Sequence, residues 1–219
     1  MPLFQVFRNL GAGFGNNSTP PAWLNTLGQQ VVMQWFQAMI LDGRGYQVRA
    51  GTITTPLVGD VVLTDTAAEY SVDAAAGTTI IPVHQIISVR LSTGTLHEYA
   101  TKSVATVSSA GAAFTPLPLF SGGSAAVTTA RVAAAGGVTV TAELATTTLR
   151  HWSYANPAAG FTGALPGDWH QEWEPVLYGS PVLVGPRSLY TQVAATTTGP
   201  SYYANLDYLE MPTLMVTPA

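Results

Sequence analysis

The sequence after Gly45 is a succession of short segments rich in Thr, Val and Ala, punctuated by Gly or Pro about every ten residues. From Val138 to Leu144, apolar and polar residues alternate with the period of a half-buried strand. No second long helical pattern interrupts these segments. The pattern therefore predicts a mainly β protein, an antiparallel, jelly-roll-like β-sandwich, rather than βαβ units. The expected strands are Tyr46–Thr55, Asp60–Thr64, Thr78–Val83, Gln85–Ser92, Thr95–Thr101, Ser103–Val107, Ala126–Ala133, Val138–Leu149, Glu172–Tyr178, Ser188–Ala194, Tyr202–Leu209 and Thr213–Thr217.

One amphipathic helix is expected before the strands, from about Pro21 to Leu41. Ser18 or Thr19 can cap its first turn, and Asp42-Gly43 is typical of a helix that ends on a left-handed residue. Its apolar residues recur at three- and four-residue spacings, and no charged residue occurs between Trp23 and Leu41. We expect its apolar side to lie on a sheet. Whether its other side contacts a second subunit or a lipid surface is not decided by the sequence.

The segment before this helix combines apolar side chains with a glycine-rich stretch from Gly11 to Gly15. Such a segment is too flexible to fold alone, yet it carries side chains that favour burial. We therefore expect an extended arm that docks elsewhere. The predicted organisation is an arm at residues 1–20, a helix packed on the sandwich at 21–43, and a single β-sandwich domain at 44–219.

Charged residues make up only 9% of the chain, whereas hydrophobic residues make up 47%. This composition excludes intrinsic disorder and indicates a largely uncharged, polar surface, which neighbouring molecules can cover at little desolvation cost. The net charge is −4, and the eight basic residues are spread singly, so sequence-specific nucleic-acid binding is not expected. Because there is no cysteine, disulfides and thiolate sites are excluded. Neither a secretory signal nor a membrane-spanning stretch is indicated.

The most concentrated ionisable residues are Asp168, His170, Glu172 and Glu174. On a strand, alternate side chains share one face, so these residues would lie opposite the neighbouring tryptophans. Asp168, His170 and Glu172 are candidate ligands of a divalent cation. A polar outer face over a Trp-filled core is the favoured interpretation. The chain contains no nucleotide-binding glycine motif and no nucleophile motif, so neither a cofactor nor an enzymatic activity is expected.

Aromatic residues are concentrated between positions 152 and 178, and Trp152, Tyr154, Trp169 and Trp173 are the candidates for binding a glycan. Flat rings beside carboxylates suit the apolar face and the hydroxyls of a sugar. Large aromatic residues of a sandwich are more often part of its core. A carbohydrate-binding adhesin or receptor-binding module is therefore the alternative function.

The sequence combines a Gly-rich apolar arm, MPLFQVFRNLGAGFGNN, with strand segments TTIIPVHQIISVRLS, GGVTVTAELATTTLRHW and SYYANLDYLEMPTLMVTP. This combination resembles viral capsid proteins, particularly bacteriophage coat, minor-capsid and cement proteins built on jelly-roll or related β-sandwiches. The resemblance implies a virion structural protein that assembles with copies of itself and with other virion proteins. It also implies that the arm reaches a neighbouring subunit. The expected assembly contacts are Phe4, Val6, Phe7, Leu10, Phe114, Leu117, Leu119, Phe120, Phe161 and Trp169.

Overall fold

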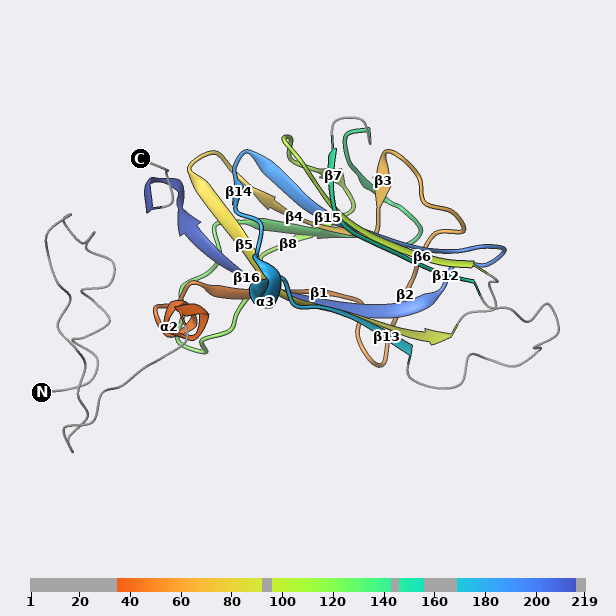
Figure 1. The fold of residues 1–219 in the computed structure, drawn as a ribbon, viewed down its shortest axis with the longest axis horizontal. Coiled ribbons are helices and arrows are strands. Elements are labelled where there is room, and N and C mark those ends of the chain that lie inside the picture. Colours follow the sequence, from red (N-terminus) through yellow and green to blue (C-terminus); the bar gives the residue numbers. More distant parts are fainter. Residues whose placement is uncertain (1–34, 92–95, 143–145, 156–168, 216–219) are drawn as a thin grey trace, which may run out of the picture.

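Two antiparallel sheets face one another in the computed structural model, which describes residues 35–91, 96–142, 146–155 and 169–215 (Figure 1). The expected arm and the first part of the expected helix, residues 1–34, lie outside the described residues. The sheets are built from eight principal strands: β1 (Gly45–Ala50), β4 (Tyr70–Ala74), β5 (Thr78–Leu91), β6 (Leu96–Val104), β12 (Thr146–Ala155), β13 (Trp169–Trp173), β15 (Arg187–Ala195) and β16 (Ser201–Pro212).

The eight principal strands have the order of a jelly roll. The first sheet contains them in the order β13-β5-β16-β1, and the second sheet in the order β12-β6-β15-β4. In the first sheet, the first principal strand pairs with the eighth, and the third with the sixth. In the second sheet, the second pairs with the seventh, and the fourth with the fifth. This is the double-sheet jelly roll, and the predicted jelly-roll-like sandwich is confirmed.

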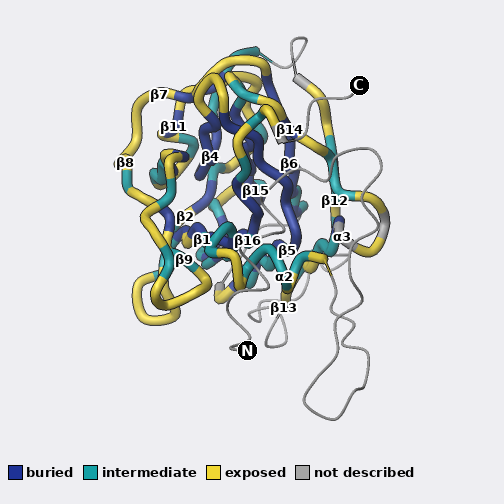
Figure 2. The backbone as a smooth tube through the Cα atoms, turned by 90° about the vertical axis from the view of Figure 1, so that its left-hand side faces the viewer, coloured by how far each residue is buried: buried dark blue, intermediate teal, exposed yellow. Residues whose placement is uncertain are grey.

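The main hydrophobic core lies between the inner faces of the two sheets. Along β16, buried residues alternate with partly exposed ones from Ser201 to Tyr208, and β1 begins with the buried Tyr46 and Val48. This alternation arises because successive side chains of a strand point to opposite faces. Figure 2 shows the burial concentrated in β4, β5, β6 and β15. The sequence therefore positions the sandwich core by simple two-residue periodicity.

A buried polar cluster crosses this core and joins the two sheets. The Gln85 amide of β5 donates hydrogen bonds to the Tyr70 hydroxyl (2.5 Å) and to Thr191 Oγ1 (2.8 Å). Its carbonyl oxygen accepts one from Thr101 Oγ1 (2.9 Å). Burial raises the pKa of Tyr70 to about 12, so the phenol stays protonated at neutral pH. The cluster thus satisfies polar groups that would otherwise destabilise the core.

The connection between β6 and β12 is a long insertion, residues 105–145, that extends both sheets. Within it, β9 pairs with β1 and continues the first sheet, whereas β10 and β8 continue the second sheet beyond β4. On the opposite side, β12 and β13 are the outermost described strands of their sheets. The strands of the insertion are β7 (Ser109–Ala110), β8 (Ala112–Phe114), β9 (Leu117–Pro118), β10 (Thr129–Val132) and β11 (Val138–Thr139).

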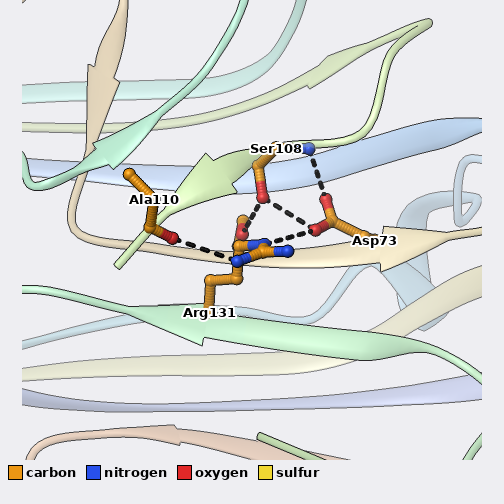
Figure 3. A network of polar contacts seen from close by, with 5 residues as sticks. Asp73, Ser108, Ala110 and Arg131 are labelled. Atoms are coloured by element: carbon orange, nitrogen blue, oxygen red, sulfur yellow. Dashed lines mark hydrogen bonds and ion pairs between the residues drawn. The ribbon is translucent and has the colours of Figure 1, made fainter. Parts of the chain in front are cut away.

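The outer face of the second sheet is covered by the chain itself. A small third sheet lies over it, formed by β3 (Ala67–Ala68), β11 and β7 (Figure 1). Beneath this layer, the Asp73 carboxylate accepts hydrogen bonds from Ser108 Oγ (2.8 Å) and Arg131 Nε (3.3 Å) (Figure 3). The apolar side chains buried here are Ala68, Val104, Val138, Val140 and Tyr190.

Glu69 precedes β4 and is buried under the same covering segments. Its carboxylate oxygens accept hydrogen bonds from the backbone amides of Val193 (2.7 Å) and Asp60 (3.3 Å). Burial raises the pKa of Glu69 to about 8, because a charged carboxylate is poorly solvated there. Glu69 therefore ties the segment around Asp60 to β15, and it is mostly protonated at neutral pH.

The helix α2 (Trp35–Leu41) lies on the outer face of the first sheet, near one end of β1 (Figure 1). Its last turn ends as the sequence predicts: Gly43 has a φ of 76°, and its amide bonds the carbonyl of Ile40 (3.0 Å). The Arg44 amide bonds the carbonyl of Met39, which completes a Schellman motif. Phe36, Met39 and Ile40 pack against Ile81, Val83 and Leu209. The expected contact of the helix with a sheet is confirmed for these residues.

Several predicted strand boundaries were wrong. The predicted strands Thr78–Val83 and Gln85–Ser92 are one strand, β5, in which a bulge at Val83 absorbs an extra residue. The prediction of a strand over Glu172–Tyr178 fails after Trp173, because a short helix, α3 (Pro175–Tyr178), begins at Pro175, whose ring suits the first turn of a helix. The chain from Val138 to Leu149 divides into β11 and the start of β12. The remaining short elements are β2 (Leu57–Val58), β14 (Leu183–Val184) and a 3-10 turn, Thr213–Met215.

Candidate functional site

Three of the expected assembly contacts, Leu117, Leu119 and Phe120, lie exposed at one edge of the first sheet. β9 brings Leu117 beside β1, and the Leu119 amide donates a hydrogen bond to the carbonyl of Gly45 (2.9 Å). Leu117 is paired with Gln47, which lies between the inward-facing Tyr46 and Val48, so the Leu117 side chain shares the outer face of the sheet. All three side chains remain in contact with solvent.

Two further apolar side chains lie at the same end of β1. Leu41 is exposed at the end of α2, just before Gly45. Val127 is exposed, and its amide donates a hydrogen bond to the Glu210 carboxylate (3.0 Å). The Glu210 amide in turn bonds the carbonyl of Arg44, which keeps Val127 close to this end of β1. We refer to Leu41, Leu117, Leu119, Phe120 and Val127 as the apolar edge.

The other expected contacts differ in their surroundings. Phe114 is only partly exposed and packs against the main core, so its ring contributes to the sandwich rather than to the apolar edge. Trp169 forms the start of β13, where it pairs with Val89, and its side chain lies outside the described residues. Phe4, Val6, Phe7, Leu10 and Phe161 lie wholly outside them.

A group of ionisable side chains lies on the outer face of the first sheet. His84 Nε2 of β5 is 2.7 Å from Glu172 Oε1 of the neighbouring β13. Glu174 follows β13, and its carboxylate completes a group of three possible ligand atoms within 4.8 Å of one another. On the other side of the imidazole, His84 Nδ1 is 3.7 Å from Asp207 Oδ2 of β16. We call His84, Glu172, Glu174 and Asp207 the outer-face cluster.

This cluster differs from the cation site that the sequence suggested. Glu172 is in both, but Asp168 lies outside the described residues. His170 is exposed on β13 opposite Ser88 and is not part of the described group of possible ligands. His84 takes its place, because the antiparallel register of β5 and β13 sets Glu172 opposite Ile86, close to His84. Sequence reasoning missed His84, since it is 88 residues away from Glu172.

The aromatic cluster does not form an open platform among its described members. The Trp152 and Tyr154 rings are stacked on one another at 6.0 Å with an interplanar angle of 7°. Trp152 also contacts the buried Tyr99 at 5.4 Å between ring centroids and packs against the main core. A cavity beside Trp152, also lined by Gln85, Thr101 and Arg150, has a volume of about 10 Å³, enough for roughly one water molecule. Of the rings predicted to bind a glycan, Trp152 and Tyr154 are thus stacked on one another, whereas Trp173 is partly buried at the end of β13.

Comparison of the chain with models of known protein families, with curated proteins and with solved structures found no match. Within the described residues, no helix is both long enough and apolar enough to cross a membrane.

Proposed function

We propose that this chain is a structural subunit of a viral capsid, a coat, minor-capsid or cement protein, which acts by packing against copies of itself and other virion proteins. The observation that carries the proposal is the apolar edge on a jelly roll. Viral capsid proteins are among the proteins that use this fold, but so are lectins, so the fold by itself does not decide the function. The exposed apolar side chains give the jelly roll a surface that another molecule can cover.

The distribution of charge also favours assembly. Charged residues are scarce, and in the part of the chain that the structure describes four of them, Glu69, Asp73, Lys102 and Glu210, are buried. Close to the apolar edge, Arg44 and Asp42 neutralise one another through a bond of 2.6 Å between Arg44 Nε and Asp42 Oδ2. Few ions would therefore lose water when a neighbouring subunit covers this surface. Burial of the apolar side chains would contribute most of the favourable free energy of association.

Light scattering of the full chain tests this proposal. We expect the protein to form a discrete oligomer, and we expect Leu117→Lys and Phe120→Lys to lower its mass to that of smaller species. Val107→Lys is the matched control, because Val107 lies outside the apolar edge and is 53% exposed, compared with 52% for Leu117. Circular dichroism would verify that each variant is folded. A wild-type protein that stays monomeric at millimolar concentration would contradict the proposal, as would equal disruption by Val107→Lys.

The arm is tested separately. Removal of residues 1–17 deletes Phe4, Val6, Phe7 and Leu10, the expected intersubunit anchors. If the arm docks on a neighbouring subunit, the shortened chain assembles less completely than the full chain at the same concentration. An unchanged oligomer mass would leave the apolar edge as the assembly surface and remove the arm from the proposal.

A further inference from the structure

The outer-face cluster has the composition and the spacing of a metal site. His84 Nε2 and carboxylate oxygens of Glu172 and Glu174 lie within 4.8 Å of one another, and they come from β5, β13 and the residue after β13. Bonds from zinc to imidazole nitrogen and carboxylate oxygen are about 2.0–2.2 Å, so two ligand atoms of one tetrahedral ion are roughly 3.3–3.6 Å apart. Small side-chain rotations, available to glutamates at the surface, bring the three atoms into this range.

A second feature is the way in which the imidazole is held. Its Nδ1 faces the Asp207 carboxylate at 3.7 Å, on the side away from the glutamates. Asp207 Oδ1 accepts a hydrogen bond from Gln47 Nε2 (2.8 Å), and Gln47 Oε1 accepts one from Arg49 Nε (2.6 Å). A carboxylate beyond the free nitrogen of a histidine is the usual support of a metal ligand, because it keeps the proton on that nitrogen. With the proton on Nδ1, the Nε2 lone pair of His84 would be directed toward the glutamates, as a metal ligand requires.

The charges of the cluster also favour a cation. Three carboxylates surround one imidazole, and among the described residues no lysine or arginine forms a salt bridge with any of them. Arg150 approaches Glu172, but it donates its hydrogen bond to the backbone carbonyl and not to the carboxylate. A divalent ion at this position would offset the negative charge and bind the two glutamates and His84 Nε2 together. Any proton on Nε2 would be released to water as the metal–nitrogen bond forms.

We propose that His84, Glu172 and Glu174 bind one divalent transition-metal ion of the zinc class, with Asp207 as a positioning residue for His84. An imidazole nitrogen combined with carboxylates suits Zn²⁺, whereas Ca²⁺ and Mg²⁺ prefer sites made of oxygen ligands only. Water completes the coordination on the solvent side, where the Glu172 side chain is exposed. This inference does not depend on the proposed role in assembly, because all three ligands belong to one chain.

Isothermal titration calorimetry of the full chain without a histidine tag, with ZnCl₂ as the probe, tests the site. We expect one Zn²⁺ per chain and weaker responses to CaCl₂ and MgCl₂. His84→Ala and Glu174→Gln are expected to lower the affinity for Zn²⁺ at least 100-fold. His170→Ala and His151→Ala are matched controls, because both residues are exposed histidines outside the cluster. Their affinities should stay within about twofold of the wild type.

Cobalt spectroscopy provides a readout that a loss of stability alone would not change. Co²⁺ bound at the site should give visible absorption bands that Zn²⁺ abolishes and that His84→Ala lacks. Asp207→Asn should lower the affinity for Zn²⁺ roughly 10- to 100-fold while the unfolding temperature without metal stays unchanged. Zinc binding that is equally tight in folded His84→Ala and Glu174→Gln, or that is lost in His170→Ala, would overturn the proposal. A preference for Ca²⁺ over Zn²⁺ would also overturn it.

Discussion

The outer faces of the two sheets carry similar kinds of side chain, but their environments are opposite. On the second sheet, Asp73 and Glu69 are buried beneath the β6–β12 insertion, the small third sheet and the segment around Asp60. On the first sheet, Asp207 and Glu172 remain accessible to solvent, and α2 packs on one end of this face. Polar residues that point outward from a sandwich are therefore not always surface residues.

This difference separates two roles of ionisable groups within one fold. A buried carboxylate must be matched by hydrogen bonds or be protonated, and it then contributes to the specificity and the stability of the packing. An accessible carboxylate needs no such matching and stays available to a ligand or a partner. Substitutions on the two faces should consequently have very different effects on stability.

The largest effect is expected for Asp73→Ala on the covered face. Removal of this carboxylate takes away the acceptor of the Ser108 amide and the charge that faces the partly buried Arg131, and we expect the free energy of unfolding to fall by about 3 kcal/mol. Urea denaturation monitored by circular dichroism measures the change. Asp207→Ala on the open face is the control and should cost less than about 1 kcal/mol. If both variants lost the same free energy of unfolding, the proposed difference between the covered and the open face would be wrong.

The next effect concerns pH and Glu69. Between the ordinary glutamate pKa of 4.5 and a folded-state pKa of about 8, the folded protein keeps a proton that the unfolded chain releases. The free energy of unfolding therefore decreases as pH rises through this window, by about 2 kcal/mol between pH 6 and pH 8. Glu69→Gln should lack this decrease. Denaturation curves at both pH values compare the two proteins, and the same pH dependence in the variant would contradict the assignment.

The smallest effect is expected where α2 lies on the open face. Ile40 is only partly buried against Ile81 and Leu209, so Ile40→Ala should lower the free energy of unfolding by about 1–2 kcal/mol. Asn205→Ala, a change of a partly exposed residue elsewhere on this face, should stay within about 0.5 kcal/mol of the wild type. Thermal and urea denaturation would measure the free energy of unfolding of both variants and of the wild type. A loss above 3 kcal/mol for Ile40→Ala would indicate that α2 belongs to the main core.

Local sequence patterns predicted much of the sandwich because its core follows a local rule. The alternation along β16 and β1, the Gly43 helix end and the absence of a second long helix all depend on neighbouring residues. β4 was not among the expected strands, although Tyr70, Val72 and Ala74 alternate with polar residues as in a half-buried strand. What the pattern does not reveal is that the polar Ser71 and Asp73 are buried as well, by Ser108 of the insertion. The coverage of that strand depends on a segment about thirty-five residues away, which a local pattern cannot reveal.

The candidate sites show the same limit. Leu117, Leu119 and Phe120 could be found from sequence because they lie between prolines and glycines. A segment of that kind forms no long strand or helix that would bury its apolar side chains. Glu172 was among the expected ligands for a similar reason, since it lies in a dense group of charges. His84 could not be found, because its proximity to Glu172 comes from the register of β5 and β13. The stacking of Trp152 on Tyr154, by contrast, is local, because residues two apart on β12 lie on the same face of the sheet.

The small third sheet makes the two broad sides of the molecule chemically unlike. If subunits join edge to edge in one orientation, they build a layer with two different surfaces, one that carries the small third sheet and one that carries the outer-face cluster. A fluorophore attached to β7 would then report which side faces outward.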